Sequence, residues 1–210
     1  MKVFDKIHGG YVHRRRVRVL GEIFASWLPR DLSILDVGCG DGLLAEEITM
    51  VRPDLEITGV DVLVRADCAI PMTPFDGETI PFGDGTFDVV LLADVLHHTT
   101  DPSRLLREAM RVSRRLIVIK DHTRNGLLAG ATLRFMDSVG NARHGVALPN
   151  NYWSQEQWAA AFEDLGLRVD EWINKVSLYP WPASLLFTRK LHFCALLAPG
   201  DLPALSKGGH

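Results

Sequence analysis

A glycine-rich turn between an apolar run and a segment of helical spacing is the feature that most constrains how this chain can fold. Residues 33–37 are mostly apolar, residues 38–42 read GCGDG, and residues 43–51 follow as a predicted helix before Pro53. Because glycine has no side chain, such a turn lets backbone N–H groups and the positive end of a helix approach a ligand closely. Taken alone, the same pattern is also typical of any tight strand-to-helix turn.

Strand-like runs and helical segments alternate on both sides of this turn. A first helix is predicted for residues 11–28, because its apolar positions recur at steps of three and four residues before Pro29. The other predicted strands are 55–60, 87–93, 116–119, 169–177 and 191–198, and the other predicted helices are 102–112 and 154–165. Alternating strands and helices imply a parallel sheet, so the sequence predicts an α/β fold.

Length and composition favour one domain over the whole chain, residues 1–210. The 210 residues are 47% hydrophobic, which is enough for one compact core. Within this domain we expect an N-terminal helical cap at residues 1–30. The alternation of strands and helices breaks after Lys120, so residues 121–158 are interpreted as an inserted cap over the substrate site.

Charge, cysteine content and hydropathy narrow the classes of partner. A formal net charge of -3 gives no general attraction to phosphate backbones, which favours a small-molecule partner. The basic cluster at residues 13–18 is expected to be a solvated helix face, and its contact with RNA phosphate is a less favoured alternative. The cysteines are far apart and form no C-x-x-C pair, so we expect neither disulfides nor a metal site. Without a signal peptide or a membrane-spanning run, we expect a cytoplasmic protein.

A carboxylate ends the second predicted strand, about 20 residues after the glycine turn. Asp61 stands where a carboxylate can accept hydrogen bonds from both hydroxyls of a ribose. The turn itself lacks the G-x-G-x-x-G spacing of a dinucleotide site, because Leu43 stands three residues after Gly40. A nicotinamide-dependent enzyme is therefore disfavoured.

The segment ILDVGCGDG at residues 34–42 resembles the S-adenosylmethionine (SAM) binding motif of class I SAM-dependent methyltransferases, in particular those with a methyltransferase type 11-like domain. Asp76 resembles the acidic loop on the adenine side of that family. DGTFDVV at residues 84–90 and DVLHH at residues 94–98 resemble the beginning and the end of its fourth strand. The resemblance covers residues 33–119 and implies a Rossmann-like, seven-stranded, mostly parallel sheet with helices on both faces and an antiparallel last strand.

The resemblance implies that SAM binds at the carboxyl ends of the strands and leaves as S-adenosyl-L-homocysteine. Asp61 matches the ribose-binding acid, and Asp36 and Asp94 are candidates to fix the ammonium end. The residues expected to contact the cofactor are Asp36, Gly38, Cys39, Gly40, Asp61, Val62, Asp76, Gly77, Asp94 and Val95. The segment after Asp61 is short and contains two prolines, so we expect the usual helix after the second strand to be reduced or absent.

Methyl transfer needs mainly the alignment of two reactants and, for some acceptors, the removal of a proton. Histidines near the carboxyl ends of strands are candidates for this base, because a neutral imidazole can accept a proton near neutral pH. His122, beside Asp121, is the first candidate and His144 in the cap is the second. The pair His97-His98 is interpreted as structural. Catalysis by proximity alone is an equal alternative.

We expect the inserted cap to build an acceptor pocket with apolar walls. The residues proposed for these walls are Phe135, Met136, Tyr152 and Trp153. They favour a small apolar or aromatic acceptor that is methylated on oxygen, nitrogen or carbon, although ordinary core aromatics would give the same pattern. A non-catalytic SAM-binding module or partner subunit is the main alternative function, and an RNA methyltransferase is a less favoured one. The sequence leaves the oligomeric state open.

Overall fold

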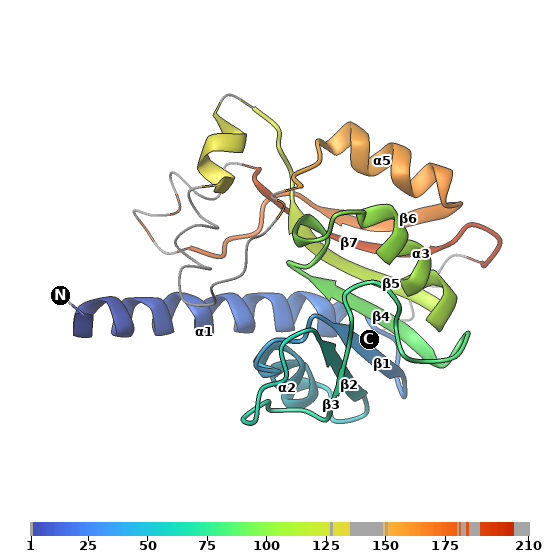
Figure 1. Ribbon diagram of the computed structural model, residues 1–210, viewed down its shortest axis with the longest axis horizontal. Helices are drawn as coiled ribbons and strands as arrows, with labels where there is room; N and C mark the ends of the chain where they lie inside the picture. Colours follow the sequence, from blue (N-terminus) through green and yellow to red (C-terminus); the bar gives the residue numbers. More distant parts are fainter. Residues whose placement is uncertain are drawn as a thin grey trace.

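Seven strands form one sheet in the order β3-β2-β1-β4-β5-β7-β6 (Figure 1). The computed structural model describes residues 2–126, 128–134, 149, 151–179, 181, 184 and 190–203, with side chains from Tyr11 onward. The strands are β1 (Ser33–Val37), β2 (Glu56–Asp61), β3 (Met72–Pro74), β4 (Phe87–Ala93), β5 (Ser113–His122), β6 (Leu167–Ile173) and β7 (His192–Pro199). Strands β3, β2, β1, β4 and β5 pair in parallel, whereas β7 is antiparallel to β5 and β6. This order confirms the predicted Rossmann-like sheet and its antiparallel last strand.

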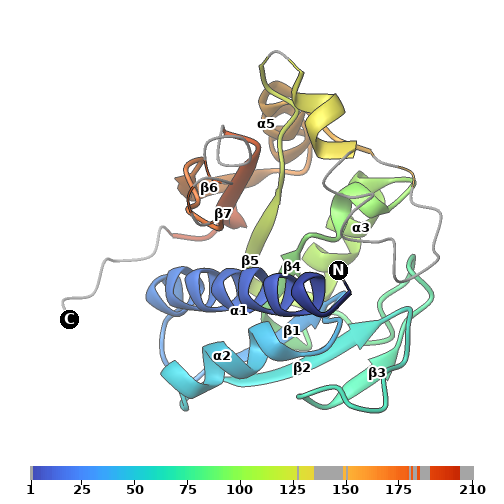
Figure 2. The same cartoon turned by 90° about the vertical axis from the view of Figure 1, so that its left-hand side faces the viewer.

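Helices cover both faces of this sheet. They are α1 (Lys2–Trp27), α2 (Leu43–Val51), α3 (Pro102–Val112) and α5 (Gln155–Asp164), with a short 3-10 helix η1 (Leu96–His98). Figures 1 and 2 show α1 and α2 side by side, and their apolar side chains share a core with one face of the sheet. Side chains of α3 and α5 form the core on the opposite face. The chain therefore buries two apolar layers around a central sheet.

Side chains that alternate along each strand contribute to both of these cores. Successive side chains of a strand point to opposite faces, so Ile34 belongs to the core that contains Phe24 of α1, while its neighbour Leu35 belongs to the core that contains Leu106 of α3. Since helices cover both faces, the central strands contain continuous apolar runs, such as residues 89–93 of β4 and 116–119 of β5, instead of alternating with polar residues. The parallel strands also end at one edge of the sheet, where open α/β sheets bind their ligands.

Several elements differ from their predicted limits, among them β6, which spans Leu167–Ile173 instead of residues 169–177. Helix α1 begins at Lys2 rather than near residue 11, and Gly9-Gly10 explain the difference because glycine has low helix propensity. Strand β5 continues to His122, so the first two residues of the predicted cap belong to the sheet. Residues 129–134 of the cap are helical.

The segment after β2 confirms one prediction and adds a strand. None of the residues between Asp61 and Met72 is helical, as the short spacing and the prolines predicted. Strand β3 pairs with β2 at the edge of the sheet and was not predicted. Pro74 obscured it, because proline weakens a strand pattern and yet is tolerated on an edge strand.

No helix within the described part of the chain is long and apolar enough to cross a membrane.

The ends of α1 and α2 are joined by the side chain of Arg52. Arg52, the C-cap of α2, donates from Nη1 to the carbonyl oxygens of Ala25 (2.9 Å) and Leu28 (2.8 Å). It also donates from Nη2 to the Pro29 carbonyl at 2.8 Å and to the Asp54 carboxylate at 2.6 Å. One guanidinium therefore satisfies carbonyl groups that the end of a helix leaves without partners.

We expect Arg52→Met to lower the free energy of unfolding by about 2 kcal/mol, because it leaves these carbonyls without their charged donor. Urea unfolding followed by circular dichroism measures the change. The matched control is Arg30→Met, since Arg30 is exposed nearby, and its effect should stay within about 0.5 kcal/mol. Equal effects of the two substitutions would contradict the role of Arg52.

Candidate functional site

The glycine turn after β1 holds three left-handed backbone positions, with φ of 72° at Gly38, 60° at Gly40 and 75° at Gly42. A side chain at Gly38 would collide with Val95, whereas no atom lies within 4 Å of a Cβ built at Gly40. The turn thus needs glycine for its conformation and leaves open space beside Gly40. That open space is where a ligand can approach the backbone.

Asp61 ties the end of β2 to this turn. Its Oδ2 accepts the backbone N–H of Gly40 at 2.8 Å, and its Oδ1 accepts that of Leu63 at 2.8 Å. Each carboxylate oxygen can accept a further hydrogen bond, so Asp61 can still receive two ligand hydroxyls. Asp61 therefore lies beside the glycine turn with capacity to accept further hydrogen bonds.

Two cavities meet at this edge of the sheet. The first, of about 450 Å³, extends past Val62, Phe75, Asp76 and Gly77, and the second, of about 380 Å³, extends toward α1. The lining residues common to both are Gly38, Asp61, Arg65, Asp94 and His98. All ten residues predicted to contact the cofactor line one or both cavities. Arg65 was missed, because nothing in the sequence marks a single arginine in an irregular segment.

Asp36 is a buried carboxylate on β1 at the wall of the second cavity. Burial raises its pKa to about 7, and the negative charges of Asp61 and Asp41 add to this effect. A neighbouring positive charge would favour the ionised form. This corner of the cavity therefore suits a cationic ligand group.

Asp94 has the opposite electrostatic setting. Burial acts to raise its pKa, but the positive charges of Lys120 and Arg16 outweigh burial and hold the pKa well below its usual range. The Arg16 guanidinium lies 2.6 Å from Oδ2, and the buried Lys120 ammonium is hydrogen-bonded to Oδ1. Asp94 also has a left-handed backbone with φ of 61°, which is rare for a residue other than glycine. Strain of this kind is common at functional sites.

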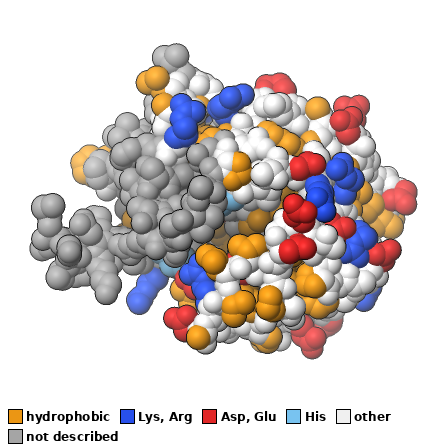
Figure 3. Space-filling view, viewed as in Figure 1, with side chains coloured by type: hydrophobic (Ala, Val, Ile, Leu, Met, Phe, Trp, Pro, Cys, Tyr) orange, Lys and Arg blue, Asp and Glu red, His pale blue; other side chains and the backbone are white. Residues whose placement is uncertain are grey.

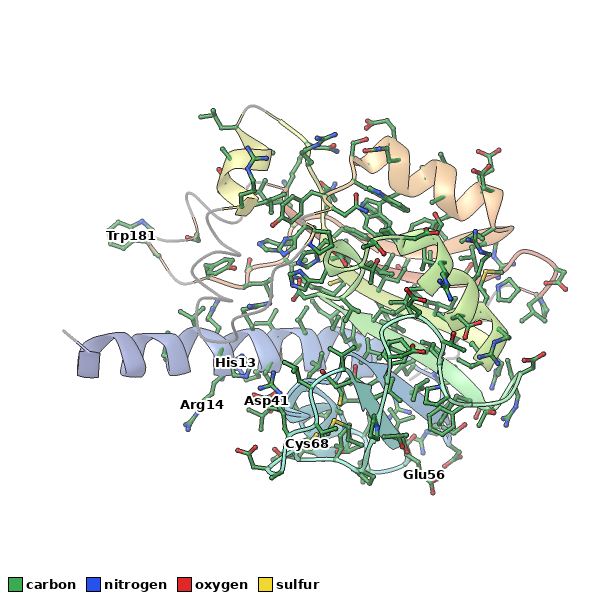
Figure 4. All side chains as sticks on the ribbon, viewed as in Figure 1. His13, Arg14, Asp41, Glu56, Cys68 and Trp181 are labelled. Carbon is green, nitrogen blue, oxygen red and sulfur yellow. The ribbon has the colours of Figure 1, made fainter. Side chains whose placement is uncertain are left out.

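Helix α1 contributes more to the site than the sequence predicted. Arg16 binds Asp94, and His13 Nε2 lies 3.1 Å from Asp41 Oδ2 in the glycine turn. Figure 4 shows His13 pointing toward Asp41 while Arg14 points away from it. The expectation of a wholly solvated basic face therefore holds for Arg14 and Arg18, which are exposed, and is wrong for Arg16. On the face drawn in Figure 3, acidic and basic side chains intermingle instead of forming one basic patch.

Asp121 is fully buried and accepts three hydrogen bonds. Its donors are the backbone N–H of Leu96 (3.1 Å), the backbone N–H of His122 (2.6 Å) and the His97 ring at Nδ1 (2.6 Å). These contacts join β5 to η1 and fix the orientation of His97. Asp121 lines neither of the two cavities, and its hydrogen bonds position its neighbours.

His122 lines the second cavity from the end of β5. Burial, followed by the charge of Lys120, lowers its pKa well below the usual value, and the same two causes lower the pKa of His192 on β7. The two rings are 4.7 Å apart between centroids. Neither ring nitrogen of His192 has a hydrogen-bond partner among the described residues. Both imidazoles are therefore neutral at physiological pH, and sequence reasoning missed His192 because it lies on a strand that was predicted only to complete the sheet.

Only part of the predicted acceptor pocket lies within the described residues. Tyr152 is buried and stacks on His97 with ring centroids 5.6 Å apart. Trp153 contacts Trp158 of the core, with centroids 4.7 Å apart, as the core alternative predicted. Phe135, Met136 and His144 lie outside the described residues.

A cluster of possible metal ligands also lies at this edge. The ligand atoms of Asp94, His97 and His122 lie within 4.8 Å of one another. The Lys120 ammonium, however, already occupies an oxygen of Asp94. We interpret the cluster as a charge-balanced hydrogen-bond network.

Comparison with known proteins gives a consistent family. A family model described as a methyltransferase domain matches residues 11–171. An uncharacterized methyltransferase of Mycobacterium sp. strain KMS is 32% identical over 143 residues, and the match covers 60% of this chain and 56% of that protein. The chain thus spans little more than half the length of that relative. A demethylmenaquinone methyltransferase of Thermotoga maritima is 30% identical over 158 residues, with 66% of each protein covered.

Solved structures show the same fold at lower sequence identity. A SAM-dependent methyltransferase from Aquifex aeolicus superposes with a TM-score of 0.60 at 18% identity, covering 89% of this chain and 92% of that one. A Haloferax volcanii complex between the Trm112 methyltransferase activator and a putative methyltransferase gives 0.64 at 15% identity, covering 87% and 90%. From its sequence match and its fold, the chain belongs to the methyltransferase domain family.

Proposed function

We propose that this chain binds SAM in the two joined cavities and transfers its methyl group to a small-molecule acceptor. The observation that carries the proposal is the arrangement of Gly40 and Asp61: an open backbone cradle lies directly beside a carboxylate that can accept ribose hydroxyls. SAM supplies an activated methyl group on a sulfonium, so the protein has mainly to align the donor and the acceptor.

In this proposal, different parts of SAM occupy the two cavities. Asp61, which lines both, would hold the ribose, and Phe75 and Asp76 would flank the adenine in the first cavity. Asp36 would attract the ammonium group in the second cavity, where its neighbours are acidic. Asp94 is less suited to that task, because Lys120 and Arg16 already balance its charge.

The acceptor would enter the second cavity, beneath α1. Val17, Leu20 and Tyr179 give this cavity an apolar part, and His122 gives it a neutral imidazole. These side chains suit a small aromatic or apolar hydroxyl compound. The named activity of the Thermotoga maritima relative, on demethylmenaquinone, agrees with such an acceptor.

His122 would accept the acceptor proton as the new bond to the methyl group forms. Its buried ring is neutral, so one of its nitrogens has a lone pair that can accept a proton. Its Nε2 also lies 3.4 Å from Asp94 Oδ1, and the negative charge of Asp94 would stabilise the resulting imidazolium. His97 is not assigned this role, because its Nε2, the nitrogen that the Asp121 contact at Nδ1 leaves as an acceptor, is buried. The three free cysteines fit a reducing compartment such as the cytoplasm.

The first test is isothermal titration with SAM, in wild type and in Asp61→Ala. We expect the substitution to weaken binding by about 1.5 to 3 kcal/mol, because the ribose hydroxyls lose their acceptor. The control Asp67→Ala removes an exposed carboxylate of the adjoining segment and should bind like wild type. Unchanged affinity in Asp61→Ala, with the fold intact by circular dichroism, would refute this site.

A second prediction concerns pH. Because Asp36 has a pKa of about 7 in the free protein and its ionised form attracts a cation, SAM affinity relative to that of Asp36→Asn should rise about tenfold between pH 6 and pH 8. Comparison with Asp36→Asn removes the contribution of the titrating amine of SAM itself. At pH 7, titrations in buffers of different ionisation enthalpy should show proton release that Asp36→Asn lacks. Proton uptake in wild type would exclude this role.

The base is tested in a screen of phenols and hydroxy acids with radiolabelled SAM. For any compound that is methylated, His122→Gln should lower kcat about 100-fold while SAM affinity stays within about twofold. Unchanged kcat would favour catalysis by proximity alone. Binding of SAM with no label transferred to any acceptor class would favour the alternative, a SAM-binding module or partner subunit; the named complex of an activator with a related fold makes that alternative worth testing.

A further inference from the structure

Two cysteines that are distant in the sequence meet beneath the glycine turn. Cys39 lies in the turn itself, and its Sγ would be only 2.5 Å from a Cβ built on Gly59 of β2. Cys68 lies in the irregular segment after β2, and its Sγ would be 3.0 Å from a Cβ built on Gly42. Glycines at positions 42 and 59 therefore leave the space that the two sulfur atoms fill.

Backbone hydrogen bonds hold the two cysteines in this arrangement. The N–H of Ala69, next to Cys68, donates to the Asp41 carbonyl at 2.9 Å, and the N–H of Gly59 donates to the Pro71 carbonyl at 2.8 Å. Figure 4 shows Cys68 below α1, close to Asp41 of the turn. The segment that carries Cys68 is thus fastened at two points around the turn that carries Cys39.

The two thiols interact and differ in exposure. Burial raises the pKa of the Cys39 thiol, and Asp36 and a side-chain hydrogen bond with Cys68 add to the effect. Cys39 is buried, whereas Cys68 is partly exposed, so an oxidant in solution meets Cys68 first. The third cysteine, Cys194, is buried on β7, three strands from β1 and therefore about 14 Å away across the sheet.

We propose that Cys39 and Cys68 are an oxidative modification site, at which peroxide forms a disulfide that lowers SAM affinity. The Cys68 thiolate attacks a peroxide oxygen, which gives a sulfenic acid and, after protonation, one water. The Cys39 sulfur then attacks the sulfenic sulfur, the S–S bond forms, and the second water leaves with the Cys39 proton. The two thiols lose two electrons in total, and hydrogen peroxide is reduced to two waters.

The disulfide acts on the cofactor through the backbone of the turn. An S–S bond of about 2.05 Å with Cβ atoms about 3.8 Å apart fixes the Cys39 side chain against Cys68. Cys39 stands between Gly38 and Gly40, so this constraint shifts the backbone beside the open space at Gly40 and the hydrogen bond from Gly40 to Asp61. The expected loss of affinity rests on the proposed function, whereas formation of the disulfide does not.

The experiment uses the full chain, first reduced and then treated with stoichiometric hydrogen peroxide. Non-reducing peptide mapping by mass spectrometry should find the peptides of Cys39 and Cys68 joined, about 2 Da lighter than their sum. Titration with S-adenosylhomocysteine should show that the peroxide-treated protein binds about tenfold more weakly than the reduced protein, and dithiothreitol should restore the affinity. Cys68→Ser should keep the affinity of reduced wild type under peroxide, and the matched control Cys194→Ser should respond like wild type.

Absence of the linked peptides after peroxide treatment would overturn the proposal, and so would a linked protein whose affinity is unchanged. A loss of affinity that persists in Cys68→Ser would overturn it as well, because it would place the oxidation elsewhere. If reduced wild type fails to bind S-adenosylhomocysteine, the proposed function fails instead. Peptide mapping then still decides whether the two thiols form a disulfide.

Discussion

The charge of the half-buried Asp94 carboxylate is the constraint on which the rest of the site depends. A carboxylate in this position is costly unless cations compensate for its lost hydration, and here Lys120 of β5 and Arg16 of α1 do so. Because Arg16 belongs to a helix far away in the sequence, balancing Asp94 also fixes α1 across the carboxyl edge of the sheet. The same Lys120 charge contributes to keeping the buried imidazole of His122 neutral. One ion-pair network thus shapes the second cavity and, together with burial, keeps the imidazole in its wall neutral.

Asp36 and Asp94 show how neighbouring carboxylates in one site acquire different properties. Asp94 stays ionised because of its cations, whereas burial and the acidic neighbours Asp61 and Asp41 raise the pKa of Asp36. The negative charges around Asp36 consequently attract a bound cation and repel a bound anion. Since SAM carries positive charge on both its ammonium and its sulfonium, the electrostatics favour it over an anionic dinucleotide. This agrees with the glycine spacing of the turn, which is an independent observation.

The sequence predicted those parts of the site that local backbone chemistry determines. Gly38, Gly40 and Asp61 were found because a turn with left-handed backbone and a carboxylate at a strand end leave local patterns. Arg16 and Lys120 were not found, because each acts through a contact with Asp94 that only the folded sheet creates. Sequence distance likewise argued against any pairing of cysteines, yet the chain path after β2 brings two of them together.

That chain path follows from the missing helix after β2. A helix there would satisfy its own backbone hydrogen bonds and could pack as an independent unit. The irregular segment instead depends on the glycine turn, through the bond from Ala69 to Asp41, and contributes Val62 and Arg65 to the cavity walls. The walls of the first cavity and the conformation of the turn are therefore coupled through this segment. Any event that moves one, whether ligand binding or a bond between sulfur atoms, has to move the other.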